Sequence, residues 1–137
     1  MVDGIPWDEV EYIVELGPGT GVFTEHIVRC ARNDAKLLAI ELEDSYIAGL
    51  EQRFGHAMEI VQASAHQLDK LVEGRSWPRI DLIISGLPFN LPQDVRDPLF
   101  ETIKRRTQSG MRYRCFTYFP AGMKRAYRDF YHPRPRL

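Results

Sequence analysis

The chain has 137 residues, enough for one compact domain and too few for two. Its 44% hydrophobic and 27% charged residues are ordinary for a globular domain, and no run of about 18 apolar residues indicates a membrane-spanning helix. Two cysteines exclude a disulfide framework, and with no signal-peptide pattern they favour a cytoplasmic protein with reduced thiols.

The two halves of the chain differ in charge. Residues 1–74 contain 14 acidic and 5 basic side chains, whereas residues 75–137 contain 5 acidic and 13 basic ones. The stretches 103–114 and 123–136 mix basic with aromatic residues, which suits an anionic membrane surface or RNA. The alternative is that the two halves intermix in the fold, so that their fields cancel.

Apolar runs alternate with helical patterns, which predicts an α/β fold built from βαβ units. We expect a Rossmann-like, doubly wound and mostly parallel sheet with strand order 3-2-1-4-5, in one domain over residues 1–137 with a tail at 132–137. Pro98 is a potential break in the helix predicted at 93–110. The strands are expected at 12–16, 36–42, 59–63, 79–85 and 113–119, and the helices at 22–32, 45–54, 65–74, 93–110 and 121–131.

A glycine-rich turn separates the first strand from the first helix. The stretch "VELGPGTG", residues 14–21, places Gly17, Gly19 and Gly21 where a ligand can approach the backbone closely. A dinucleotide motif, G-x-G-x-x-G, would need its third glycine at position 22, which is Val22. The turn has no Lys or Arg for a phosphate and carries Glu15, so a cationic ligand suits it better.

Glu41 closes the second strand, at the place where an acid binds ribose hydroxyls. A pocket that suits a ribose and a positive charge, without phosphate, fits S-adenosylmethionine. A plain dinucleotide site and a glycine-rich turn without any ligand remain as alternatives.

The motif E-x-G-x-G-x-G, with an acid closing strand two, resembles the class I S-adenosylmethionine-dependent methyltransferases over roughly residues 10–120. The resemblance implies that Glu15, Gly17 and Gly19 border the methionine moiety, that Glu41 holds the ribose and that Leu42 lies beside the adenine. Ser64 stands where the family often has an acid for the adenine amino group. The residues assigned to the cofactor in this way are Glu15, Gly17, Gly19, Gly21, Glu41, Leu42, Ser64, Ala65 and Gly86.

The turn "SGLPF", residues 85–89, follows strand four, where the family lines its methyl-acceptor pocket. The rRNA adenine dimethyltransferases have Asn-Leu-Pro-Tyr there, and Gly86 replaces that Asn, so the side-chain acceptor is missing. With "FTY" at 116–118, the turn is more similar to the phospholipid N-methyltransferases. That similarity implies N-methylation of a lipid headgroup amine at the membrane periphery, with an acceptor site formed by Ser85, Phe89, Asn90 and Tyr118.

Two other functions stay open: an RNA or protein methyltransferase, and a non-catalytic module that binds a nucleotide or a partner. Asp94 and Glu15 are candidates for the general base by position only. No metal is expected, because the four histidines have no ligand spacing. The family's C-terminal hairpin is not found, which would leave strand five as an edge and favours a homodimer.

Overall fold

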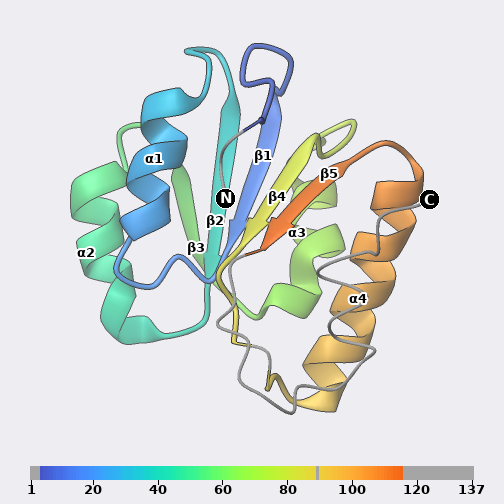
Figure 1. Ribbon diagram of the computed structural model, residues 1–137. Helices are drawn as coiled ribbons and strands as arrows, with labels where there is room; N and C mark the ends of the chain where they lie inside the picture. Colours follow the sequence, from blue (N-terminus) through green and yellow to red (C-terminus); the bar gives the residue numbers. More distant parts are fainter. Residues whose placement is uncertain (1–3, 89, 116–137) are drawn as a thin grey trace.

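A computed structural model describes residues 4–88 and 90–115 of the chain. Five parallel strands form one sheet in the order β3-β2-β1-β4-β5, which confirms the predicted topology (Figure 1). The elements are β1 Tyr12–Leu16, α1 Val22–Cys30, β2 Lys36–Glu41, α2 Asp44–Phe54, β3 Glu59–Gln62, the 3-10 helix η1 Ala65–Gln67, α3 Leu68–Gly74, β4 Leu82–Ser85, α4 Gln93–Gln108 and β5 Arg112–Cys115.

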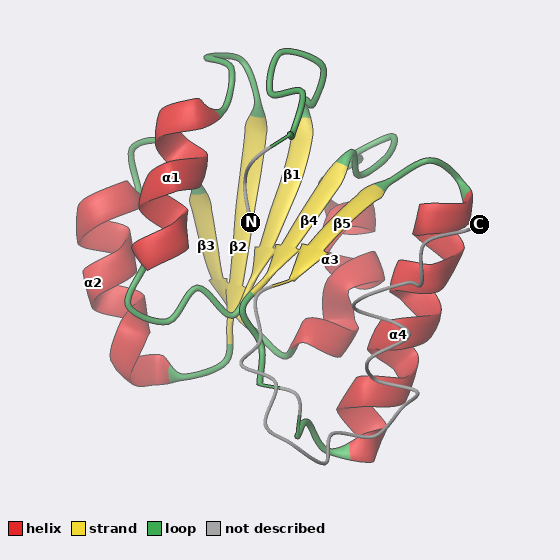
Figure 2. Cartoon of the chain, viewed as in Figure 1, coloured by secondary structure: helices red, strands yellow, loops and turns green. Residues whose placement is uncertain are grey.

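Helices cover both faces of the sheet, α1 and α2 on one side and α3 and α4 on the other (Figure 2). Alternate side chains of β1 therefore enter different cores. Ile13 packs with Ile27 of α1, whereas Val14 packs in the cluster that contains Leu68 of α3 and Leu99 of α4. Burial on both faces explains why the strands read as continuous apolar runs.

Several predicted boundaries were wrong. Helix α4 continues through Pro98, which is exposed; only the carbonyl of Asp94 loses its helical donor there, and water can replace it. The helix predicted at 65–74 is the short η1 followed by α3. Strand β4 begins at Leu82 rather than at 79; just before it, the Asp81 carboxylate accepts the backbone N–H groups of Glu11 and Tyr12.

The predictions for the C-terminal part of the chain concern residues that the structure does not describe. Residues 116–119 of the fifth strand, the helix at 121–131, the tail at 132–137 and the question of the hairpin all lie outside the described ranges. The homodimer stays a prediction. In the part of the chain that is described, no helix has the length and apolarity needed to cross a bilayer.

The parallel arrangement brings the carboxyl ends of the strands to one edge of the sheet, where the arrowheads converge in Figure 1. Leu16 of β1 is in register with Ile40 of β2 and with Ser85 of β4, and Glu41 is in register with Gln62 of β3. The loops that carry the sequence motifs all leave this edge, so they meet in space.

An ion-pair network joins α3 to α4. Asp69 Oδ1 accepts from Arg106 Nη2 at 2.7 Å, Asp69 Oδ2 accepts from Thr102 Oγ1 at 3.1 Å, and Arg105 also contacts the carboxylate. Burial opposes ionisation of Asp69, but the hydrogen bonds from Arg105, Arg106 and Thr102 outweigh it and hold the pKa of Asp69 below its usual value.

Replacing Asp69 should loosen the contact between these two helices. We expect Asp69→Asn to lower the free energy of unfolding at neutral pH by about 1–3 kcal/mol, because two guanidinium groups lose their counter-charge. Since the folded pKa is lowered, this contribution disappears as the pH falls through it. Urea denaturation measures the difference. Asp97→Asn, which breaks the exposed pair with Arg96, is the control and should cost less than about 1 kcal/mol; equal effects would contradict the assignment.

Candidate functional site

The glycine loop after β1 takes a left-handed course that only glycine adopts readily. Gly17, Gly19 and Gly21 have φ values of 66°, 58° and 90°. The Gly17 N–H donates to the Ile40 carbonyl at 2.9 Å, which fixes the loop against the end of β2. A Cβ at Gly21 would lie 2.7 Å from Phe54 Cε2, so this glycine lets the loop pack closely against α2.

Glu41 connects the glycine loop to the start of α2. Its Oε1 accepts the Gly19 N–H at 2.8 Å and its Oε2 accepts the Glu43 N–H at 3.0 Å. The side chain is buried, with 7% of its surface exposed. Both oxygens thus face backbone donors at the carboxyl edge of the sheet, and each retains a lone pair for a further donor.

The glycine loop also touches the turn after β4. The Gly86 N–H donates to the Leu16 carbonyl at 2.8 Å. A Cβ on Gly86 would lie 3.1 Å from the Gly17 carbonyl oxygen, and a Cβ on Gly17 would lie 2.8 Å from Leu87 Cδ2. The two turns therefore pack closely, and a side chain at either position would require the opposite turn to move.

A cavity of about 230 Å³ opens at this edge of the sheet. Glu41 and Glu43 supply carboxylates at one side, and the apolar wall comes largely from the segment after β4. No Lys or Arg is among the described residues that line it. These are Ile40, Glu41, Leu42, Glu43, Ala63, Ser64, Ala65, Leu87, Pro88, Leu91, Pro92 and Val95.

The lining suits a nucleoside without phosphates. A flat base fits between small and aliphatic side chains such as Ala63, Ala65 and Leu87, and the carboxylate of Glu41 is an acceptor for hydroxyl groups. Above the loop, a Cβ on Gly19 would meet no atom within 4 Å, so its backbone is open to a ligand. The residues present therefore fit the cofactor expected from the sequence.

Known proteins with similar sequences act on a lipid and on RNA. The chain is 27% identical over 133 residues to the ornithine lipid N-methyltransferase of Singulisphaera acidiphila, a match that covers 95% of this chain and 69% of that protein. It is 30% identical over 107 residues to the ribosomal RNA small subunit methyltransferase A of Mycoplasma mycoides, covering 76% of this chain and 38% of the relative. No family model matches the chain.

Solved structures agree on the fold. A TehB-like S-adenosylmethionine-dependent methyltransferase from Corynebacterium glutamicum superposes with a TM-score of 0.60 at 23% identity, over 88% of this chain and 60% of that one. The DhpI–SAM–HEP complex, in which SAM is S-adenosylmethionine, also gives 0.60, at 16% identity over 90% and 54% of the chains. The chain is a relative of the S-adenosylmethionine-dependent methyltransferases. The resemblance drawn from the motifs is thereby confirmed, and S-adenosylmethionine as the expected cofactor agrees with it.

Glu15 is the first residue of the E-x-G-x-G-x-G motif. It is buried at the end of β1, before the glycine loop, and does not line the cavity. Its carboxyl is 2% exposed, and Oε1 accepts from Thr24 Oγ1 of α1 at 2.5 Å. Burial raises the pKa of Glu15 to about 7; the Thr24 hydrogen bond opposes this rise and repulsion from Glu41 adds to it. Glu15 therefore links the end of β1 to α1 through Thr24.

Of the residues assigned to the methyl-acceptor site, the structure describes Ser85 and Asn90. Ser85 is 2% exposed, and its Oγ accepts the Leu87 N–H at 3.4 Å, so it shapes the turn. Asn90 is exposed on the same segment. Phe89 and Tyr118 lie outside the described residues.

Sequence reasoning missed most of the apolar wall of the cavity. Leu91 and Val95 were assigned no role, yet both line it. Leu91 precedes α4 and Val95 lies in its first turn, so helical spacing does not link them and the sequence carries no signal of their shared place in the wall. Glu43 was missed as well, although it follows the ribose acid by only two positions.

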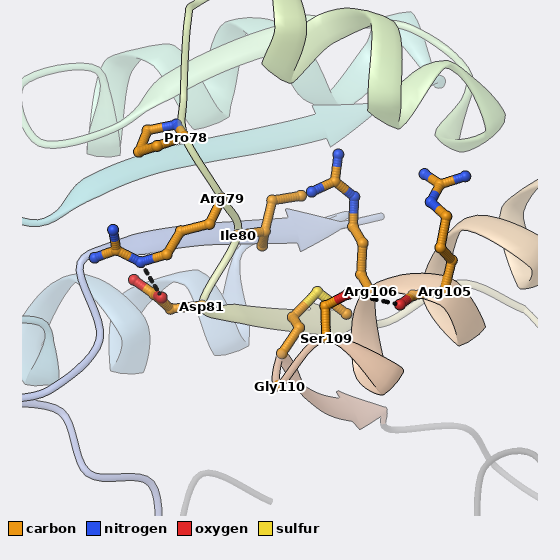
Figure 3. A pocket seen from close by; sticks show the side chains of 9 residues that line it. Pro78, Arg79, Ile80, Asp81, Arg105, Arg106, Ser109 and Gly110 are labelled. Carbon is orange, nitrogen blue, oxygen red and sulfur yellow. Dashed lines mark hydrogen bonds and ion pairs between the residues drawn. The ribbon is translucent and has the colours of Figure 1, made fainter.

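The basic side chains of the described part lie mainly away from this cavity. A second cavity, of about 360 Å³, lies at the amino ends of β4 and β5 (Figure 3). There Arg79 pairs with Asp81 at 2.7 Å, while Arg105 and Arg106 bind Asp69. These guanidinium groups already have counter-charges, so acidic and basic residues intermix here. No group of three or more His, Cys, Asp or Glu side chains suited to a metal ion occurs in residues 4–88 and 90–115.

The raised pKa of Glu15 predicts a pH-dependent stability. Because the folded protein binds this proton more tightly than the unfolded chain, stability should fall as the pH rises from about 4.5 to about 7. We expect wild type to lose about 3 kcal/mol relative to Glu15→Gln between pH ~5 and pH ~8, measured by urea denaturation.

The control for this experiment is Glu25→Gln, which changes an exposed acid on the same helix as Thr24. It should follow the wild-type pH profile. A Glu15→Gln profile parallel to wild type would show that Glu15 is already ionised in the folded protein.

Proposed function

We propose that this chain transfers a methyl group from S-adenosylmethionine to the amine of a lipid headgroup of the ornithine-lipid type. The observation that carries the choice of acceptor is the acidic character of the cavity and its surroundings. The similarity to the ornithine lipid enzyme, which spans 95% of the chain, supports it.

The charged residues described in and near the cavity are mostly carboxylates. Glu41 and Glu43 line it, and Asp94 and Asp97 follow Pro92 on the first two turns of α4, around a shallow hollow of their own. Arg96 is the basic residue of that stretch, and it contacts Asp97 at 3.1 Å.

This charge pattern attracts a protonated amine and repels a phosphate backbone. RNA-binding sites gain most of their affinity from Lys and Arg that neutralise phosphates. A headgroup that carries an ammonium, by contrast, is drawn to a negative cleft. Gly86 also favours a headgroup amine over a nucleic acid base, since it provides no side-chain acceptor for the amino group of a base.

Within this proposal, each cofactor group has a partner in the chain. Glu41 accepts the ribose hydroxyls, Leu42 and Ala65 border the base, and the open backbone at Gly19 borders the methionine part. When bound, S-adenosylmethionine supplies an electrophilic methyl group. The chain's own contribution is positioning and the exclusion of water.

An amine acceptor arrives as an ammonium and must lose a proton before its lone pair can react. Asp94 and Asp97 lie on the same helix as Val95 of the cavity wall, around a separate shallow hollow, and are the candidate proton acceptors. Glu15 is buried at the end of β1, so the proton is more readily taken by the exposed pair on α4.

Glu41 should determine cofactor affinity. We expect Glu41→Gln to weaken S-adenosylhomocysteine binding about 10- to 100-fold in isothermal titration calorimetry, because a buried charged acceptor is lost. Glu43→Gln is the matched control, since it removes a charge from the same cavity while Glu41 keeps both backbone bonds. It should change the affinity by less than about threefold, and equal losses in both variants would rule out a specific role for Glu41.

The acceptor can be identified with a methyl-labelled cofactor. We expect label to enter ornithine lipid or phosphatidylethanolamine presented in neutral detergent micelles, and not small-subunit rRNA. Phosphatidylcholine is the control lipid, because its nitrogen has no proton to replace. Label in RNA would overturn the lipid assignment, and tight cofactor binding without labelling of any acceptor would favour a non-catalytic module.

A further inference from the structure

Arg53 reaches from the last turn of α2 to the glycine loop. Its Nη1 donates to the Thr20 carbonyl at 2.8 Å, although the two residues are 33 positions apart in the sequence. In the part of the chain that the structure describes, this carbonyl has no other donor. Arg53 does not line the cavity, so any effect that it has on a ligand there passes through the loop.

Gly21 leaves the space that this contact needs. It is buried, its φ is 90°, and a Cβ there would lie 3.3 Å from Arg53 Nη1 and 2.7 Å from Phe54 Cε2. The guanidinium carbon lies 4.7 Å from the centroid of the Phe54 ring, and Nη2 is 3.8 Å from Glu25 Oε2 of α1. These contacts orient the guanidinium, which thereby joins the loop to both helices on this side of the sheet.

The peptide group between Thr20 and Gly21 is bonded at both ends. Its carbonyl accepts from Arg53, and its N–H donates to the Pro18 carbonyl at 3.0 Å. The preceding half of the loop is held separately, by the bond from the Gly19 N–H to the carboxylate at the end of β2. Removing the guanidinium should therefore release the second half of the loop and leave the first half bonded.

A loop with three glycines has many accessible conformations unless it is held. Glycine loses more conformational freedom on ordering than any other residue. If the loop orders only when a ligand arrives, that cost is subtracted from the affinity, whereas a loop that is already held in the receptive form binds more tightly.

Resting on the proposed function, we infer that Arg53 is a positioning residue for the cofactor: by bonding the Thr20 carbonyl, it keeps the glycine loop in the form that receives the methionine part. The nucleoside part lies against the wall that contains Leu42 and Ala65, so its binding does not depend on this bond. Loss of Arg53 should therefore act on one part of the ligand only.

The test compares two ligands by calorimetry: S-adenosylhomocysteine and methylthioadenosine, which keeps the nucleoside and the sulfur but lacks the amino acid part. We expect Arg53→Met to weaken S-adenosylhomocysteine about fivefold or more and methylthioadenosine less than about twofold. Methionine preserves the helix propensity of this position. A role in folding alone would weaken both ligands to the same extent.

Arg29→Met is the matched control. It removes the same charge from α1, where Arg29 is exposed and contacts His26 of its own helix. It should change neither affinity by more than about twofold, because an exposed charge away from the loop has little effect. Melting curves of both variants, followed by circular dichroism, check that each is folded.

Hydrogen exchange tests the loop without any ligand. We expect the Gly21 amide, followed by NMR, to exchange at least about threefold faster in Arg53→Met than in wild type, because its peptide group has lost one of its two bonds. The Gly17 amide, which donates to the Ile40 carbonyl, should keep its exchange rate and serves as the internal control.

The results separate this inference from the proposed function. Selective weakening of S-adenosylhomocysteine together with faster Gly21 exchange supports the inference. An unchanged affinity for S-adenosylhomocysteine, or an equal loss for both ligands, contradicts it. If wild type binds neither ligand, the cofactor assignment fails and positioning of the cofactor fails with it, while the exchange rate of Gly21 still shows whether Arg53 holds the loop.

Discussion

The architecture of the site depends on one buried carboxylate. Glu41 accepts the Gly19 N–H with one oxygen and the Glu43 N–H with the other, so a single side chain holds the glycine loop and the first residues of α2 in one arrangement. The glycine loop in turn supports the turn after β4 through the Leu16 carbonyl. Together these links hold the glycine loop, the start of α2 and the turn after β4 relative to one another at the carboxyl edge of the sheet.

The order and direction of the strands could be predicted because the central strands β1, β2 and β4 are buried on both faces. Runs such as residues 12–16 and 36–41 have few polar residues, and they alternate with helical patterns that fix the crossovers. Boundaries that depend on side-chain hydrogen bonds could not be predicted. The contacts of Asp81, just before β4, with Glu11 and Tyr12 join residues that are far apart in the sequence.

The site was predictable where backbone conformation demands a residue type. The glycines at 17, 19 and 21 predict backbone with positive φ, which the structure has. Glu41 could be recognised from its position at the end of β2. The apolar wall was not predictable, because Leu91 and Val95 resemble ordinary core residues until the fold shows that they face a cavity. The hydrogen bond between Thr24 and Glu15 was equally hidden, since a threonine within an amphipathic helix gives no sign of its partner.

The close contact between Gly17 and Gly86 has a consequence for how the protein can change. A Cβ on either residue would reach into the other turn, at 2.8 Å from Leu87 Cδ2 in one case and 3.1 Å from the Gly17 carbonyl in the other. A side chain at Gly86 therefore requires the Gly17 carbonyl to move slightly, and a side chain at Gly17 requires the Leu87 side chain to move. Each replacement thus acts on the opposite turn, so the residues tolerated at one position depend on the other.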